Sequence, residues 1–264
     1  MVTVGIDLAA QPKYTAACVV VWEEVVTVSA PRTGLTDDDL LRYIAQGDMT
    51  GIDVPLGWPQ RFTAAIATHA ARGRWPDEPI DEQITRRATD RFVRATVGMQ
   101  PLSVATDRIA IPAMRAARVL SRLERPVERD GRDRIVEVYP AASLKTWGFV
   151  HRGYKGREGA GIRAALVDHF IEATAAWVAI SAEARSAMVR DDNAFDALVA
   201  ALTARAWMGG LARPIPDELQ AAAATEGWIA LPRPGSLATL ATVPKPPLTE
   251  RAEARTGIST PLRA

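Results

Sequence analysis

Apolar runs rich in β-branched residues alternate with short polar turns through the N-terminal part of the chain, which is typical of a β-meander. A helix and a fourth apolar run, stopped by Pro55, follow. A right-handed crossover through that helix lets the first and fourth strands pair in parallel. The predicted elements are strands at residues 3–8, 16–22, 25–29 and 50–54, and a helix at 37–45 that opens with the capping box Thr36-x-x-Asp39.

The middle of the chain, about residues 58–134, has a different character. It holds 15 Arg and no Lys against 10 acidic residues, a net charge of +5, and six prolines interrupt it. These features do not continue the pattern of the meander. We interpret the segment as an Arg-rich helical insertion between two strands of the sheet.

Beyond the insertion the strand pattern returns at residues 134–139 and is closed by Pro140. Helices are predicted at about 162–177 and 193–208, and a last short strand at 227–231. The segment after Thr242 has too little apolar content to pack. We therefore expect an α/β fold over residues 1–232, with a mixed sheet (a three-stranded meander plus parallel strands) flanked by helices, and a disordered tail over residues 243–264.

The composition is that of an ordinary globular protein. At 264 residues and 48% hydrophobic content, the chain can bury one large core. A net charge of +1 neither favours nor disfavours nucleic acid as a partner. The single cysteine, Cys18, is too few for disulfide or metal–thiolate chemistry, and its apolar run predicts a buried thiol in a reducing compartment.

The sequence also bears on location. No apolar run approaches the roughly 18 residues that a membrane span needs. Residues 1–10 lack the basic start and long apolar run of a signal peptide. The expected location is cytoplasmic, with no membrane partner.

In two short segments an apolar run ends directly at an aspartate. They are Val4-Gly5-Ile6-Asp7 and Thr50-Gly51-Ile52-Asp53. A carboxylate at the end of a buried strand costs several kcal/mol to desolvate unless a positive charge meets it. If the two strands are parallel neighbours, both carboxylates reach the same edge of the sheet, where open α/β folds bind ligands. Two such acids suggest a shared cation, although either one alone is explained by a turn after its strand.

A third strand and the last long helix add further acids. Glu137 lies on the opposite face of its strand from the neighbouring valines, so it is either a site residue or an exposed strand residue. In the helix at 193–208, Asp192 and Asp196 lie one turn apart at the border of the apolar face. Asp192, like Asp191, stands where a helix N-cap is expected. Asp196 lies inside the helix, where capping does not explain it.

Carboxylates without paired His or Cys favour a hard divalent cation, because Mg²⁺ and Mn²⁺ take oxygen ligands. Two such ions about 3.5 to 4 Å apart can activate a water and hold the leaving oxygen of a phosphodiester. We predict Mg²⁺ or Mn²⁺ at Asp7, Asp53, Asp192 and Asp196, and a catalytic role for Asp7, Asp53, Glu137 and Asp196.

Five motifs together resemble a bacterial and archaeal family called domain of unknown function 429. They are Val4-Gly5-Ile6-Asp7-Leu8-Ala9, Gly51-Ile52-Asp53-Val54-Pro55-Leu56-Gly57, Arg86-Arg87-Ala88-Thr89-Asp90-Arg91, Glu137-Val138-Tyr139-Pro140 and Asp192-Asn193-Ala194-Phe195-Asp196-Ala197-Leu198. The resemblance runs from Val2 to about Pro232. It implies a ribonuclease H-like fold, a metal-dependent nuclease activity, and site roles for the five acids of these strands and the last helix.

The Arg86-Arg87 motif has a physical interpretation of its own. On a helix, Arg87, Arg91 and Arg94 line one face with Asp90 beside them, and this face can hold a phosphate backbone by bidentate contacts. Arg86 belongs to the same predicted binding set. The alternative is a solvated or salt-bridged face in which Arg86 pairs with Asp90 at i,i+4.

A second basic segment is the glycine-rich loop at residues 153–161, ahead of a predicted helix. Its backbone amides, together with Lys155 and Arg157, form a candidate phosphate cradle at the helix N-terminus. The loop lacks the Gly-Lys-Ser/Thr ending of a P-loop, so a flexible connection is the alternative.

Three function classes remain open. The first is a metal-dependent nuclease or phosphodiesterase acting on DNA or RNA. The second is an actin- or sugar-kinase-like ATP-dependent phosphotransferase, whose phosphate hairpin is rich in glycine, unlike the segment after Asp7. The third is a catalytically silent relative that binds nucleic acid or another partner.

Overall fold

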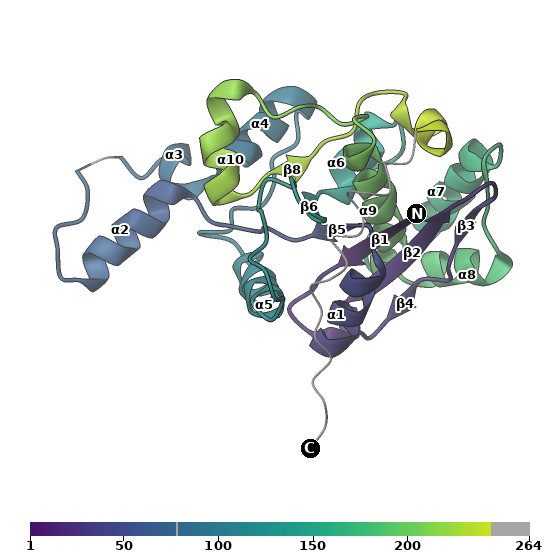
Figure 1. The fold of residues 1–264 in the computed structure, drawn as a ribbon, viewed down its shortest axis with the longest axis horizontal. Helices are drawn as coiled ribbons and strands as arrows, with labels where there is room; N and C mark the ends of the chain where they lie inside the picture. Colours follow the sequence, from purple (N-terminus) through teal and green to yellow (C-terminus); the bar gives the residue numbers. More distant parts are fainter. Residues whose placement is uncertain (78, 244–264) are drawn as a thin grey trace, which may run out of the picture.

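The computed structural model describes residues 1–77 and 79–243, and a mixed eight-stranded sheet forms its centre (Figure 1). The strands lie in the order β7-β3-β2-β1-β5-β6-β8, and β4 pairs separately with β2. They are β1 (Val2–Asp7), β2 (Ala16–Trp22), β3 (Val26–Val28), β4 (Arg32–Thr33), β5 (Met49–Asp53), β6 (Ile135–Val138), β7 (Val178–Ala179) and β8 (Ile229–Ala230).

The predicted mixed α/β architecture is confirmed. The first three strands form an antiparallel meander, and β1, β5, β6 and β8 run parallel. The crossover from β2–β3 to β5 passes through α1, which begins after the predicted capping box of Thr36 and Asp39. The two-residue strands β4 and β7 were not predicted, because such short strands show no periodicity.

Helices cover both faces of the sheet. On one face, α1 and α5 pack over a core that includes Val4, Ile6 and Ile52. On the other face, α9 lies along β1, β2 and β5 and is itself enclosed by α6, α7 and α8. The helices are α1 (Asp37–Gln46), α2 (Gln60–Ala70), α3 (Glu82–Thr85), α4 (Ala88–Val97), α5 (Ala110–Leu120), α6 (Pro140–Thr146), α7 (Ala160–Thr174), α8 (Ala182–Arg190), α9 (Asp192–Met208) and α10 (Gln220–Glu226).

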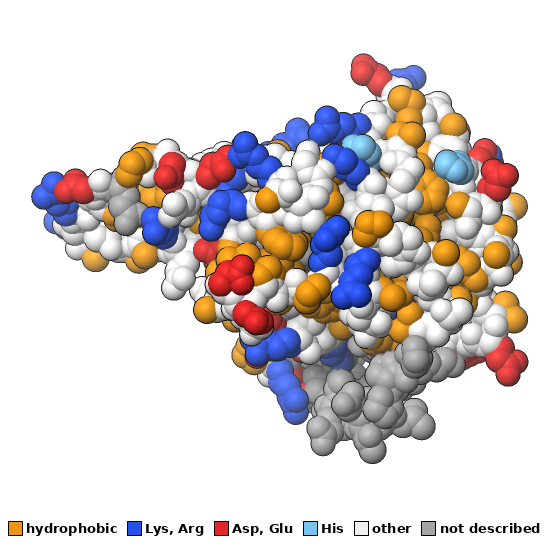
Figure 2. All heavy atoms as spheres, turned by 90° about the horizontal axis from the view of Figure 1, so that it is seen from above, with side chains coloured by type: hydrophobic (Ala, Val, Ile, Leu, Met, Phe, Trp, Pro, Cys, Tyr) orange, Lys and Arg blue, Asp and Glu red, His pale blue; other side chains and the backbone are white. Residues whose placement is uncertain are grey.

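The segment between β5 and β6 is helical over much of its length, and α2 and α3 extend from the rest of the molecule as a projection (Figure 1). Figure 2 shows basic and acidic side chains side by side along this projection. Several of its arginines are paired with acids, for example Arg74 with Asp77 and Arg94 with Glu82.

Three further observations concern Cys18, the membrane and the tail. Cys18 is buried as predicted, and burial raises the pKa of its thiol to about 12. Within the described residues, no helix is long and apolar enough to cross a membrane. The predicted disordered tail at 243–264 lies outside the described residues, apart from Val243, whose carbonyl oxygen accepts a hydrogen bond from Arg205 at 2.6 Å.

Helix α9 is buried on all sides, not only on the apolar face that the sequence predicts. Every residue from Ala194 to Ala206 is buried. The larger side chains pack against the surrounding helices, while a stripe of alanines, including Ala197, Ala200 and Ala201, lies against the sheet. A one-sided hydrophobic pattern misses this second face, because alanine contributes little to it.

Glycines in β1 and β5 permit the close approach of α9. A Cβ atom on Gly5 would lie 1.9 Å from the carbonyl oxygen of Ala197, and a Cβ on Gly51 would lie 2.5 Å from that of Ala200. Both contacts are with backbone atoms, which cannot rotate away. Gly5 and Gly51 are register partners in the parallel pair of β1 and β5. Together they form a surface without side chains, against which α9 packs.

We predict that Gly5→Ala and Gly51→Ala each destabilise the fold by about 3 kcal/mol or more, because the added methyl pushes α9 off the sheet. Gly161→Ala is the matched control: Gly161 lies in α7 with no atom within 4 Å of its Cβ position. That change should stabilise the fold by about 0.5 to 1 kcal/mol. Urea unfolding measures all three free energies, and equal effects at the three sites would contradict this role for Gly5 and Gly51.

Candidate metal centre

Three carboxylates meet where β1 and β5 end beneath the first turns of α9. Asp7 and Asp53 are register partners, as the two Gly-Ile-Asp motifs predict. They lie two residues beyond Gly5 and Gly51, on the face of the sheet that α9 covers. Asp196 of α9 completes the group, and one carboxylate oxygen from each residue lies within 4.8 Å of the others.

The environment of these acids disfavours negative charge without a cation. Burial, followed by the charge of Asp53, raises the pKa of Asp7 well above its usual value. Burial also raises the pKa of Asp53 to about 7; Lys155 opposes this shift and Asp196 adds to it. Desolvation and mutual repulsion therefore act together, and a bound cation would relieve both.

Asp196 has the most specific contacts of the three. Its side chain is fully buried; Oδ1 accepts a hydrogen bond from the Tyr154 hydroxyl at 2.7 Å, and Oδ2 lies 2.6 Å from Lys155 Nζ in an ion pair. Oδ2 nevertheless has no hydrogen bond of acceptable geometry. A buried carboxylate oxygen with an unused lone pair, next to two further carboxylates, fits a hard divalent ion.

The loop at residues 153–159 carries Lys155 into this group of acids, whereas the sequence suggested a phosphate cradle there. Burial alone would lower the pKa of Lys155, but the charge of Asp196, with smaller contributions from Asp7 and Asp53, raises it well above its usual value. Arg157, two residues further on, is exposed. The two basic residues of the loop therefore have different surroundings.

Asp192 holds this loop and lies outside the group of three. Its Oδ1 accepts a hydrogen bond from the backbone N–H of Gly156 at 3.0 Å, and its side chain is partly exposed. Asp191, and not Asp192, is the N-cap of α9, with its side chain accepting from the N–H of Asn193.

Glu137 is buried on the opposite face of the sheet, so it does not join the three aspartates. It is the register partner of Ile52, which places it on the face away from α9. There it forms a bidentate ion pair with Arg87, at 2.6 and 2.7 Å, and accepts the N–H of Leu56 at 2.9 Å. Burial raises the pKa of Glu137, and the charge of Arg87 opposes that shift.

Arg87 is 1% exposed, whereas the sequence suggests an exposed Arg face. It precedes α4 and bonds Asp90 as well as Glu137, so Asp90 pairs with Arg87 and not with Arg86. The side chain of Arg86 donates to the carbonyl of Pro101. The guanidinium of Arg87 is thus committed to two buried acids.

The other two arginines of the predicted face have different surroundings. Arg91 is partly buried and donates to the carbonyl of Arg86. Arg94 is exposed and pairs with Glu82. The four arginines therefore do not form one surface.

Sequence reasoning missed Glu226, which fastens two helices of the insertion. Its carboxylate accepts the first N–H groups of α2 and α4, from Gln60 at 2.8 Å and Ala88 at 2.6 Å. The side chain thus caps two helix N-termini from a distant part of the chain. No local pattern around Glu226 signals this role, because both partners lie more than 130 residues away.

Two tyrosines near the aspartates were also missed. Tyr154 donates to Asp196, and Tyr139 lies close enough for Asp53 and Asp196 to add to the rise in its pKa that burial causes. Tyr139 directly follows β6, in the Glu137-Val138-Tyr139-Pro140 motif, and this position after a strand was an available signal.

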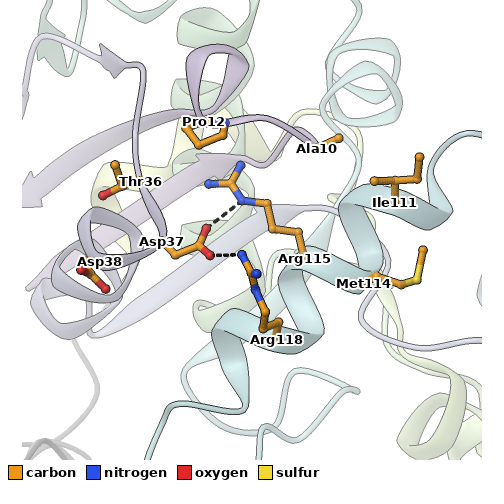
Figure 3. A pocket seen from close by; sticks show the side chains of 9 residues that line it. All are labelled: Ala10, Pro12, Thr36, Asp37, Asp38, Ile111, Met114, Arg115 and Arg118. Carbon is orange, nitrogen blue, oxygen red and sulfur yellow. Dashed lines mark hydrogen bonds and ion pairs between the residues drawn. The ribbon is translucent and has the colours of Figure 1, made fainter.

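A separate pocket of about 600 Å³ lies between α1, α5 and the connection after β1 (Figure 3). Arg115 and Arg118 both reach Asp37 in it, at 2.8 and 2.5 Å. Burial alone would raise the pKa of Asp37, but the hydrogen bonds from these two arginines lower it below its usual value. None of the three clustered aspartates lines this pocket. Its charged groups are all in ion pairs, Asp37 with Arg115 and Arg118, and Asp38 with Arg122.

Comparison with known proteins places the chain in one family. Residues 5–221 match the family described as protein of unknown function (DUF429). The chain belongs to the DUF429 family. The match covers all three clustered aspartates as well as Lys155, Arg87 and Glu137, but ends before Glu226. Searches of the curated proteins and of the solved structures found no match.

We predict that breaking the ion pair between Arg87 and Glu137 destabilises this DUF429 protein by about 3 to 5 kcal/mol. Arg87→Met leaves the buried Glu137 and Asp90 without their cation, and Glu137→Gln removes one of the two acids that compensate the buried guanidinium. The variants are Arg87→Met and Glu137→Gln, measured by urea unfolding. Arg74→Met, which breaks an exposed pair, is the control and should cost about 1 kcal/mol or less. A similarly small loss at Arg87 or Glu137 would contradict the structural role assigned to their ion pair.

Proposed function

We propose that this protein is a metal-dependent phosphodiesterase that acts on nucleic acid. The observation that carries the proposal is the meeting of Asp7, Asp53 and Asp196 within 4.8 Å, where Oδ2 of the buried Asp196 is in an ion pair with Lys155 but accepts no directed hydrogen bond. Oxygen-only donors of this kind suit Mg²⁺ or Mn²⁺. When bound there, the ion would activate a water and stabilise the charge that develops on the phosphate.

The topology supports the same proposal. An antiparallel meander continues into parallel strands, and the acids come from the ends of β1 and β5 and from the last long helix. This is the order that the ribonuclease H-like resemblance implies. The connection from β1 to β2 contains no glycine, so it offers little support for the phosphotransferase alternative.

The protein's own residues have distinct tasks in this proposal. Asp7, Asp53 and Asp196 hold the cation at the sheet edge. Tyr154 fixes the carboxylate of Asp196 through its hydroxyl. In hydrolysis the water oxygen bonds to phosphorus and the P–O bond to one sugar breaks; one proton ends on the leaving hydroxyl and the other is released to solvent.

We predict that Mn²⁺ raises the melting temperature of the wild type but not of Asp7→Asn or Asp53→Asn. At 100 times Kd, the ion adds about 2.7 kcal/mol to the free energy of unfolding. For a chain of this size that corresponds to a shift of about 5 to 10 °C. Without metal, both variants should melt no lower than the wild type, because Asn removes a repelling, desolvated charge.

The matching activity measurement uses single-stranded, duplex and hybrid oligonucleotides with Mg²⁺ or Mn²⁺. Cleavage should require the ion and be lost in both variants, while Asp77→Asn, at an exposed pair on the projection, keeps it. A wild type that neither binds Mn²⁺ nor cleaves any substrate would refute the proposal. ATP turnover without cleavage would favour the phosphotransferase.

A further inference from the structure

Lys155 forms an ion pair with Asp196, one of the three clustered aspartates, and its charge also acts on Asp7 and Asp53. Its stem is half exposed, at 52%, but its ammonium lies 2.6 Å from the buried Oδ2 of Asp196. A long, solvated side chain usually keeps its charge in water. Here the charge points inward, beside the three carboxylates that would hold the divalent ion of the proposed site.

The backbone on both sides of Lys155 is fixed by buried contacts. Arg163, which is 3% exposed, donates to the carbonyl oxygens of Tyr154 at 2.7 Å and Gly156 at 2.9 Å. Asp192 accepts the N–H of Gly156, and Asp196 accepts the hydroxyl of Tyr154. The loop therefore presents Lys155 in a set position and is not a flexible connection.

The turn of the loop also depends on its glycines. Gly153 and Gly156 have φ values of +76° and +71°, in the region that favours glycine. A Cβ on Gly159 would lie 2.5 to 2.6 Å from backbone atoms of residues 153–155, so this close return of the chain requires glycine. Such a preorganised loop is typical of a functional position.

We infer that the Lys155 ammonium is a built-in second cation of the site, so that the three aspartates hold one divalent ion and not two. The inference rests on the proposed metal-dependent function and deepens it. Charge balance supports it: one divalent ion and one ammonium neutralise three carboxylates, whereas two divalent ions beside the ammonium leave a large positive excess. Lys155 then supplies the positive charge that a second metal ion supplies in two-metal sites.

The test is to count Mn²⁺ ions bound per molecule of full-length protein by electron paramagnetic resonance, which distinguishes free from bound ion. The wild type should bind one ion. Lys155→Met and Lys155→Gln should bind two, because the vacated position accepts a second cation. Lys155→Arg keeps the charge and should bind one. Lys13→Met, which removes a lysine that lies over the Tyr14 ring, is the matched control and should also bind one.

Activity gives a second readout. At Mn²⁺ concentrations too low to fill the vacated position, the neutral variants should cleave the oligonucleotide about 100-fold more slowly, and higher Mn²⁺ should restore part of the rate. Two ions in the wild type, or only one ion in both neutral variants at saturating Mn²⁺, would overturn the inference and leave the proposed function standing. No bound ion in the wild type would overturn both. Circular dichroism of each variant establishes that it is folded, and the two neutral variants serve as checks on each other.

Discussion

The close packing of α9 against β1 and β5 is the constraint on which the site depends. Gly5 and Gly51 leave space that a Cβ atom would fill, and the alanines of α9 occupy it. Because side chains alternate along a strand, Asp7 and Asp53 lie on the same face two residues further on. The helix that rests on the glycines therefore brings Asp196 over both acids. The two Gly-Ile-Asp motifs therefore determine both the packing of α9 on the sheet and the position of the carboxylates.

Buried charge occurs on both faces of the sheet, with opposite consequences. On the face away from α9, Arg87 satisfies Glu137 and Asp90 with short, charge-assisted hydrogen bonds. On the α9 face, three carboxylates share one ammonium, and an oxygen of Asp196 has no hydrogen bond. In the first group every carboxylate oxygen accepts a hydrogen bond, and the group holds the insertion to the sheet. The second is incomplete, which is expected where a ligand binds. Glu137 also accepts the N–H of Leu56, three residues beyond Asp53 of the second group.

Local sequence patterns predict much of this fold but only part of the candidate site. Apolar runs rich in β-branched residues predict the meander and β5, and Thr36 and Asp39 predict the start of α1, because these depend on neighbours in the sequence. Register then follows from two matching motifs. The burial of Arg87 does not, since its partner Glu137 is 50 residues away. The inward position of Lys155 depends on Arg163 and Asp192, which no spacing rule connects to it. The glycines of the two motifs were an available signal for a close helix, but a strand glycine alone does not say what approaches it.

The central claim is that α9 and the ends of β1 and β5 together form a cation site. The most direct measurement is anomalous diffraction from a crystal of the wild type soaked in Mn²⁺. We predict one anomalous peak within about 2.0 to 2.6 Å of oxygens from Asp7, Asp53 and Asp196, the range of Mg²⁺ and Ca²⁺ bonds to oxygen ligands. A crystal with no peak at these residues, or with its strongest peak at other acids of the chain, would contradict it.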